Sequence, residues 1–176
     1  FSQARQKVSP KAFIHMLNQV NRWYYKETPF KKYREYRLIA IDGTVLEINN
    51  TEELRNEFGY IENQNKKVAR ARASALYDVE NDMIIDSKLT HYRCGEREIA
   101  ESLIDEMINL GSYNDLILFD RGYPSKDFIT FIESRTLKYL MRVSSGFLKV
   151  VINAPNQDQI IEVKHKDKVL KIDRKS

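Results

Sequence analysis

Two short apolar runs, each followed by an aspartate, constrain the fold of this chain more than any other feature. Residues 38–41 read Leu-Ile-Ala-Ile and lead into Asp42, and residues 116–119 read Leu-Ile-Leu-Phe and lead into Asp120. Runs that are apolar on both faces are typical of central, buried strands. A glycine within two positions of each aspartate would let the chain turn there. Because ligand sites of open α/β sheets collect at the carboxyl ends of strands, we expect both carboxylates at one edge of a sheet.

The remaining pattern supplies the other strands and the helices of an α/β fold. Alternating segments predict strands, and apolar residues at helical spacing predict helices. Strand–helix–strand units imply a mixed sheet with parallel strands and helices packed on it. The expected elements are a helix from Ser9 and Pro10 to Thr28, a hairpin of strands 69–77 and 83–89, a helix over 96–110 ending at Gly111, a helix capped by Ser125, a strand over 137–143, and short strands over 149–153, 159–164 and 169–172.

Charge is distributed unevenly along the chain. The net charge is +4 over 176 residues, but residues 1–41 hold nine Lys or Arg against two Glu. The first 41 residues therefore carry +7 and the rest carries −3. A basic arm beside a mildly acidic body suits a polyanion-binding segment next to a metal-binding centre. A solvated helical surface would produce the same distribution.

Composition excludes several classes of protein. The one cysteine, Cys94, rules out an internal disulfide and any cysteine-based zinc cluster. No apolar run approaches the roughly 20 residues that a membrane-spanning helix needs. The polar, basic first ten residues do not resemble a secretory signal. A reduced, intracellular setting without a membrane partner is the expectation.

The two aspartates suggest metal chemistry. Neighbouring strands lie about 4.8 Å apart, so carboxylates at their ends would repel each other unless a divalent cation lies between them. Oxygen ligands alone favour Mg²⁺ or Mn²⁺ over zinc. Two such ions activate a water or a 3′-hydroxyl and stabilise the leaving oxygen of a phosphodiester. The alternative is that Asp42 and Asp120 are turn or helix-capping residues.

Several motifs in sequence order resemble those of DDE transposases of bacterial insertion sequences. They are Ser2-Gln3-Ala4-Arg5-Gln6-Lys7-Val8-Ser9-Pro10 with Phe13 after it, then Ile41-Asp42-Gly43-Thr44, and then Phe119-Asp120-Arg121-Gly122-Tyr123. The resemblance is to the branch whose ribonuclease H-like catalytic domain is interrupted by a β-rich insertion. It implies a ribonuclease H-like α/β fold with a mixed sheet and flanking helices.

The resemblance also implies the site. By position, Asp42 and Asp120 match the first two catalytic metal ligands, which hold two Mg²⁺ or Mn²⁺ ions in the intact enzyme. The third ligand is a Glu in a Tyr-x2-Arg-x3-Glu-x6-Lys signature. Only Tyr139 has an arginine at the required spacing, Arg142, and Gly146 stands where the Glu is due. We therefore expect the third Glu to lie outside this chain, and the chain to be an inactive fragment.

Three segments follow from the same resemblance. They are an N-terminal helical arm over 1–35, an incomplete catalytic core over 36–146, and the start of the β-rich insertion over 147–176. The parent enzyme would cut and join double-stranded DNA at transposon ends as a homodimer, in the bacterial cytoplasm and associated with the nucleoid. Arg121 would contact a DNA phosphate, although an arginine in a loop is more often a surface or salt-bridge residue.

Two other functions are compatible with parts of the sequence. The chain could be a non-catalytic, DNA-binding remnant of a transposase. It also shares Asp-Gly-Thr after an apolar strand with haloacid dehalogenase-type phosphatases, but Ala40 stands where those enzymes have their nucleophilic aspartate. Among the remaining residues, we expect Tyr123 to pack in the core, and we expect residues 23–25, Trp-Tyr-Tyr, to pack the helical arm onto the body.

Overall fold

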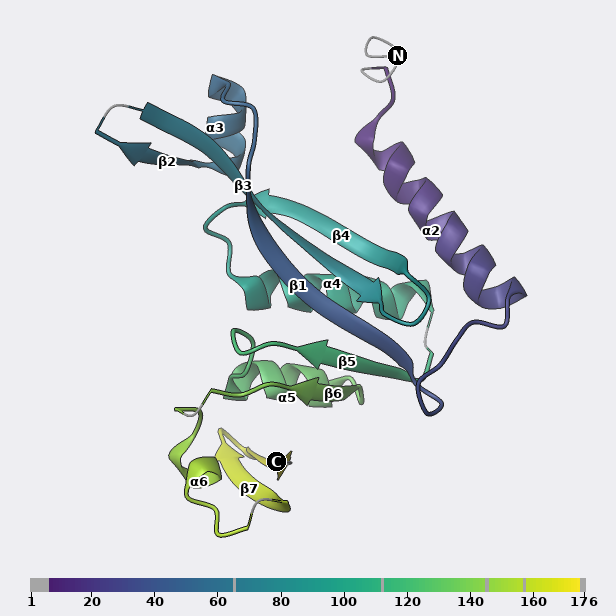
Figure 1. The fold of residues 1–176 in the computed structure, drawn as a ribbon, viewed down its shortest axis with the longest axis vertical. Helices are drawn as coiled ribbons and strands as arrows, with labels where there is room; N and C mark the ends of the chain where they lie inside the picture. Colours follow the sequence, from purple (N-terminus) through teal and green to yellow (C-terminus); the bar gives the residue numbers. More distant parts are fainter. Residues whose placement is uncertain (1–6, 65, 112, 145, 157, 175–176) are drawn as a thin grey trace. The chain divides into compact units, whose positions relative to one another are not determined.

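A computed structural model describes residues 7–64, 66–111, 113–144, 146–156 and 158–174 (Figure 1). The chain forms two compact units, Phe1–Leu116 and Ile117–Ser176. Residues 2–6 of the N-terminal motif and Ser145, near the expected end of the catalytic core, lie outside the described residues. The segment boundaries expected near residues 36 and 146 stay predictions.

The first unit is organised around one long strand. Strand β3 (Lys66–Asp78) pairs antiparallel with β1 (Arg37–Glu47) on one side. On its other side it pairs with β4 (Met83–His91) and, nearer its start, with β2 (Tyr60–Asn63). The expected hairpin of β3 and β4 is confirmed, and Asp82 in its turn adopts a positive φ of 53°, as turn aspartates readily do.

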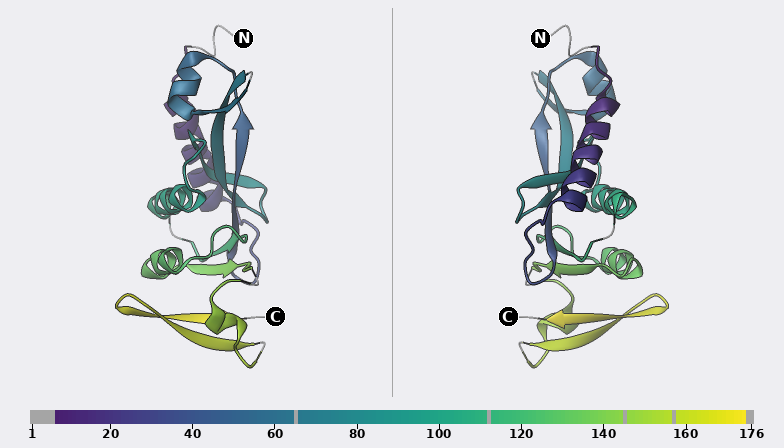
Figure 2. Two further views of the ribbon diagram at one scale, coloured as in Figure 1. Left: turned by 90° about the vertical axis from the view of Figure 1, so that its left-hand side faces the viewer. Right: turned by 90° about the vertical axis from the view of Figure 1, so that its right-hand side faces the viewer.

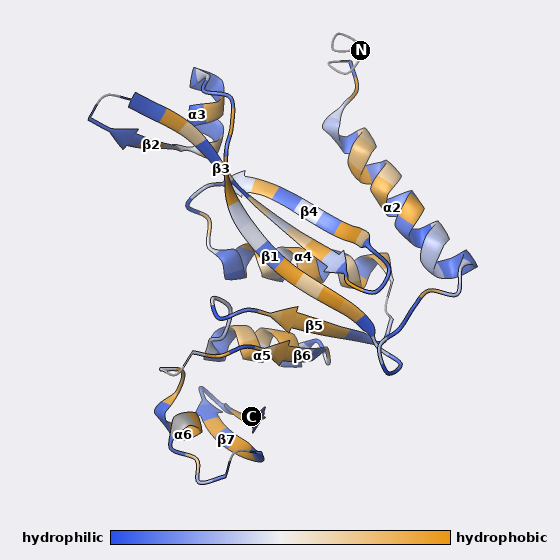
Figure 3. Ribbon diagram, viewed as in Figure 1, coloured by the Kyte–Doolittle hydropathy of each residue, from blue (hydrophilic) through white to orange (hydrophobic). Residues whose placement is uncertain are grey.

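Asp42 lies within β1, so the expectation that a strand ends at this residue is wrong. Asp42 pairs with Ala75, and the pairing with β3 continues as far as Glu47 opposite Arg70. What ends at Asp42 is the buried half of the strand: burial alternates up to Ile41, and Asp42 and the residues from Thr44 onward are exposed. Figure 3 shows the apolar residues of the buried half of β1 in orange. The long partner strand β3 keeps the chain extended past the glycine.

Two helices lie on the same face of this sheet (Figure 2). Helix α2 (Pro10–Glu27) begins where expected, because the Ser9 hydroxyl accepts a hydrogen bond from the Lys11 amide at 3.3 Å. Helix α4 (Glu96–Leu110) packs against β3 and β4 and ends at Gly111 as predicted. Its buried residues are Ile99, Ala100, Leu103, Ile104 and Met107.

Burial on α2 differs from the apolar pattern of its sequence. The inward residues are Asn21 and Tyr25, and Asn21 donates to the carbonyl oxygens of Ile84 and Ile85 at 3.1 and 2.9 Å. Packing through the aromatic end of the helix is confirmed for Tyr25, which is 6% exposed. The same expectation is wrong for Trp23, which is 63% exposed.

Helix α3 (Glu52–Phe58) and strand β2 were not expected from the sequence. Thr51 caps α3 by accepting from the Leu54 amide at 3.3 Å. Gly59 ends it with φ at 88°, and any side chain at this position would collide with His91 and Tyr92. Glycine is therefore favoured both by the backbone conformation and by the close approach of the His91 and Tyr92 side chains.

The second unit contains a strand–helix–strand segment. Strand β5 (Asp115–Phe119), which begins in the first unit, is followed by α5 (Lys126–Ser134) and β6 (Lys138–Met141). The Arg142 amide donates to the Phe119 carbonyl oxygen at 2.9 Å, so the carboxyl ends of β5 and β6 are adjacent, as in a parallel crossover unit. Ser125 caps α5 as predicted. The expected α/β class, a mixed sheet with flanking helices, is confirmed.

The tail of the chain is β-rich apart from one helical turn. The strands expected over 159–164 and 169–172 are present as β7 (Gln159–His165) and β8 (Lys168–Arg174), which pair antiparallel. The expected strand over 149–153 is wrong, because residues Lys149–Ile152 form the short helix α6. The helical turn directs Val151 into a small buried cluster, and this packing outweighs the β-propensity of a Val-Val-Ile run. The buried members of the cluster are Ile129, Val151, Ile161, Val163 and Leu170.

None of the helices in the described part of the chain is both long enough and apolar enough to cross a membrane.

Candidate functional site

Asp42 is held in a defined position on β1. Its Oδ1 accepts a hydrogen bond from the Gly43 amide at 2.8 Å, and its carbonyl oxygen accepts from the Ser74 hydroxyl of β3 at 2.9 Å. The preceding Ile41 is 3% exposed, which anchors the backbone in the core. The Asp42 side chain is exposed. A fixed backbone therefore presents an accessible carboxylate.

Asp120 follows the last residue of β5, as predicted. Its side chain is 68% exposed, while its carbonyl oxygen accepts from the Tyr123 amide at 3.2 Å and closes a turn. Tyr123 is 2% exposed and packs against Phe119 and Phe128, with ring centroids 5.4 and 6.0 Å away. Core packing of Tyr123 is thus confirmed, and the aromatic cluster fixes the turn that carries Asp120.

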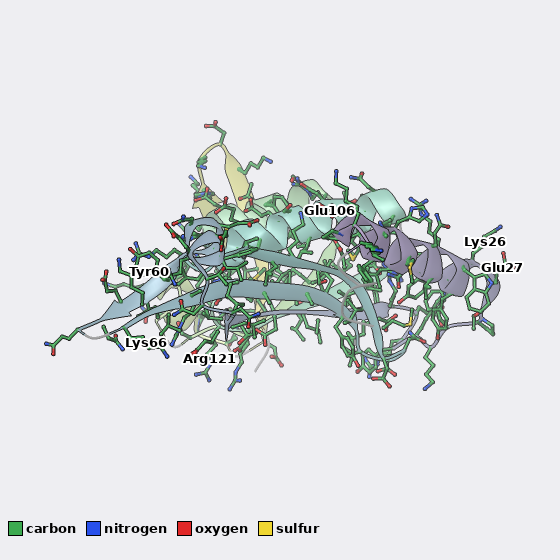
Figure 4. The ribbon with its side chains drawn as sticks, turned by 90° about the horizontal axis from the view of Figure 1, so that it is seen from above. Lys26, Glu27, Tyr60, Lys66, Glu106 and Arg121 are labelled. Carbon is green, nitrogen blue, oxygen red and sulfur yellow. The ribbon has the colours of Figure 1, made fainter. Side chains whose placement is uncertain are left out.

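Arg142 was not among the candidate site residues expected from the sequence. Its Nη1 lies 3.9 Å from Asp120 Oδ1, because the adjacent ends of β5 and β6 bring the two residues together. The sequence predicted parallel strands in a strand–helix–strand unit here, but its expected strand over 137–143 contained Arg142, whereas β6 ends at Met141. Arg121, the arginine expected to contact a phosphate, is exposed at the surface (Figure 4).

The donor chemistry fits a hard divalent cation. Asp42 and Asp120 both offer accessible carboxylate oxygens, which are the ligands preferred by Mg²⁺ and Mn²⁺. Within the described residues, no group of three or more His, Cys, Asp or Glu is arranged to hold a metal ion. Asp42 belongs to the first unit and Asp120 to the second, so their convergence on shared ions stays a prediction.

Comparison with protein families decides the class of the chain. A family model described as a transposase DDE domain matches residues 33–176. The chain belongs to the transposase DDE domain family. This match includes both aspartates and leaves the haloacid dehalogenase alternative without support.

Solved structures of two transposases are similar to this transposase domain at low sequence identity. A piggyBac transposase synaptic complex with hairpin DNA is 15% identical, with a TM-score of 0.44 over 74% of this chain and 29% of that one. A Mos1 transposase paired-end complex with the left transposon end is 9% identical, with a TM-score of 0.43 over 74% of this chain and 41% of that one. The domain thus spans less than half of either solved transposase. No curated protein sequence matches it.

Proposed function

We propose that this chain supplies two of the metal-binding carboxylates, Asp42 and Asp120, of an enzyme that cuts and joins DNA at transposon ends. The observation that supports the proposal most is the transposase DDE domain match across residues 33–176. Exposed carboxylates on anchored backbone at both positions are consistent with it. When bound, two Mg²⁺ or Mn²⁺ ions would activate the attacking oxygen and stabilise the leaving one.

The chain's own residues would prepare this site. The hydrogen bond from the Gly43 amide orients one oxygen of Asp42 and leaves the other available to a ligand. The buried Tyr123 and Phe119 hold the turn at Asp120. Such support matters because metal ligands act only when their geometry is fixed in advance.

The finer features of the enzyme are part of the same proposal. We infer a parent from a bacterial insertion sequence, of the branch with the β-rich insertion and the Tyr-Arg-Glu-Lys signature. It would act as a homodimer on double-stranded DNA in the cytoplasm, associated with the nucleoid. The segment over 36–146 would be its catalytic core and 147–176 the start of its insertion. Since the third Glu is expected outside this chain, the chain alone would have little or no activity.

Cleavage of transposon-end DNA by the parent enzyme tests the proposal. We expect Asp42→Asn and Asp120→Asn each to reduce Mg²⁺-dependent cleavage by at least about a hundredfold, because the ions lose a ligand. The same substitution at Asp82 serves as a control, because this exposed carboxylate lies in the β3–β4 turn and bonds to the Tyr77 hydroxyl. Wild-type cleavage by both site variants would overturn the enzymatic role and favour a non-catalytic DNA-binding remnant.

A further inference from the structure

Arg142 lies beside Asp120 because of the backbone, not because of a strong side-chain attraction. The hydrogen bond from its amide to the Phe119 carbonyl oxygen, 2.9 Å long, fixes the residue next to the end of β5. Its Nη1 is 3.9 Å from Asp120 Oδ1, the outer limit for an ion pair. The position of Arg142 is therefore set even when Asp120 is engaged elsewhere.

The ion pair between Arg142 and Asp120 contributes little to the free energy of unfolding. The side chains of Arg142 and Asp120 are 67% and 68% exposed, and water screens ion pairs at such exposure. A long, flexible arginine side chain also loses rotamer freedom when it is held in one ion pair. Stability thus gives no reason for an arginine at position 142. The accessible guanidinium of Arg142 retains N–H donors for another anion.

We propose that Arg142 binds a phosphate of the DNA backbone next to the Asp120 end of the site, an inference that rests on the proposed function. A guanidinium presents several N–H donors in a plane and pairs with phosphate oxygens two at a time. A cation on the Asp120 carboxylate would compete with Arg142 for that carboxylate. The arginine would then be available to the phosphate that the cation attracts.

The contact would position the DNA without reading its sequence. Phosphate contacts fix the register of a protein on DNA and carry no base information. Arg142 would therefore strengthen binding to every duplex to a similar extent, and its contribution would weaken as salt rises. A residue that merely neutralises Asp120 would have neither effect.

Salt-dependent binding of this chain to a random-sequence DNA duplex tests the proposal. Binding is measured with Ca²⁺ present between about 50 and 300 mM KCl, where loss of one phosphate contact flattens the plot of log affinity against log salt by about 0.9. For Arg142→Ala we expect this flattening and an affinity about five- to tenfold lower at low salt. Arg142→Lys should keep the slope, because it keeps the charge, and lose part of the affinity.

Lys138 provides the matched control. It is an exposed cation at the other end of β6, about 13 Å along the strand from Arg142. Lys138→Ala removes the same charge and should leave the slope unchanged. Thermal unfolding of all three variants should match the wild type, since the side chains are exposed.

The outcomes separate this inference from the proposed function. An unchanged slope for Arg142→Ala, an equal effect of Lys138→Ala, or no duplex binding by the wild-type chain would overturn the role of Arg142. None of these results would restore cleavage to Asp42→Asn or Asp120→Asn in the parent enzyme. Conversely, normal cleavage by those two variants would overturn the catalytic proposal even if Arg142→Ala flattened the slope.

Discussion

Arg37 and Asp115 form an ion pair that is almost completely shielded from water. Arg37 Nε lies 2.6 Å from Asp115 Oδ1 and Nη2 lies 3.0 Å from Oδ2, with the two side chains only 2% and 3% exposed. The Arg37 amide also donates to the Asn114 carbonyl oxygen at 2.8 Å. The pair thus joins the first residues of β1 and β5, the two strands that carry Asp42 and lead into Asp120.

Breaking this pair should be severely destabilising. Asp115→Asn would remove the carboxylate that pairs with the buried Arg37 guanidinium, at a cost of about 3–5 kcal/mol in the free energy of unfolding. Urea unfolding measures this loss. The control is Glu62→Gln, which breaks the exposed pair with Lys67, 3.5 Å long, and should cost less than about 1 kcal/mol. Equal effects would contradict the structural role of the buried pair.

The packing of the aromatic end of α2 should depend on the hydroxyl of Tyr25. Tyr25 donates to Asp78 Oδ2 at 2.7 Å, and Asp78 is completely buried. Tyr25→Phe should therefore lower the free energy of unfolding by about 1–3 kcal/mol, because a buried carboxylate loses a donor. Trp23→Ala, two residues earlier and largely exposed, should change it by less than about 0.5 kcal/mol. A larger effect at Trp23 would show that α2 packs differently.

Stability should fall as pH rises through a window set by Asp86. Burial, reinforced by a hydrogen bond to Glu106 of α4, raises the pKa of Asp86 to about 6. For Glu106 burial opposes ionisation, but hydrogen bonds with Lys88 and Asp86 outweigh it, and the pKa of Glu106 is lowered. The native chain then holds a proton on Asp86 between about pH 4 and 6 that the unfolded chain has released. The stabilisation that comes from protonated Asp86 is fully present below this pH window and is lost above it.

Asp86→Asn isolates this effect. The amide is neutral at every pH, so the variant should lack the decrease in stability between about pH 4 and 6 and should gain up to about 2 kcal/mol relative to the wild type at pH 8. Free energies of unfolding at a series of pH values measure the difference. Parallel profiles for the two proteins would contradict the raised pKa of Asp86 in the native chain.

Much of the fold follows from local sequence patterns. The apolar periodicity of 96–110, the alternation of 69–77 and the caps at Ser9 and Ser125 predicted elements that the structure contains. These patterns succeed because a buried face imposes a period of 3.6 or 2 on the sequence. Helix α3 has no buried residue and therefore leaves no such pattern.

The errors in prediction arise from packing that is distant in sequence. Continuous pairing with β3 keeps β1 extended through Gly43, a residue that suggested a turn. Packing within the second unit places Val151 in a helical turn, against the β-propensity of its local sequence. For the site, the structure bears out that Asp42 and Asp120 carry exposed carboxylates beside buried strand residues, and their role as metal ligands stays a prediction. The sequence did not single out Arg142, because the expected strand over 137–143 contained this residue, whereas β6 ends at Met141.

We propose that Asp42 and Asp120 bind the same ions, and the Mn²⁺ affinities in a double-mutant cycle test this most directly. If the carboxylates share ions, Asp42→Asn and Asp120→Asn should each weaken Mn²⁺ binding by about tenfold or more, and the double variant should be little weaker than either single one. Calorimetry on this chain measures all four affinities. Independent effects that multiply in the double variant, or unchanged affinity in both single variants, would contradict the claim.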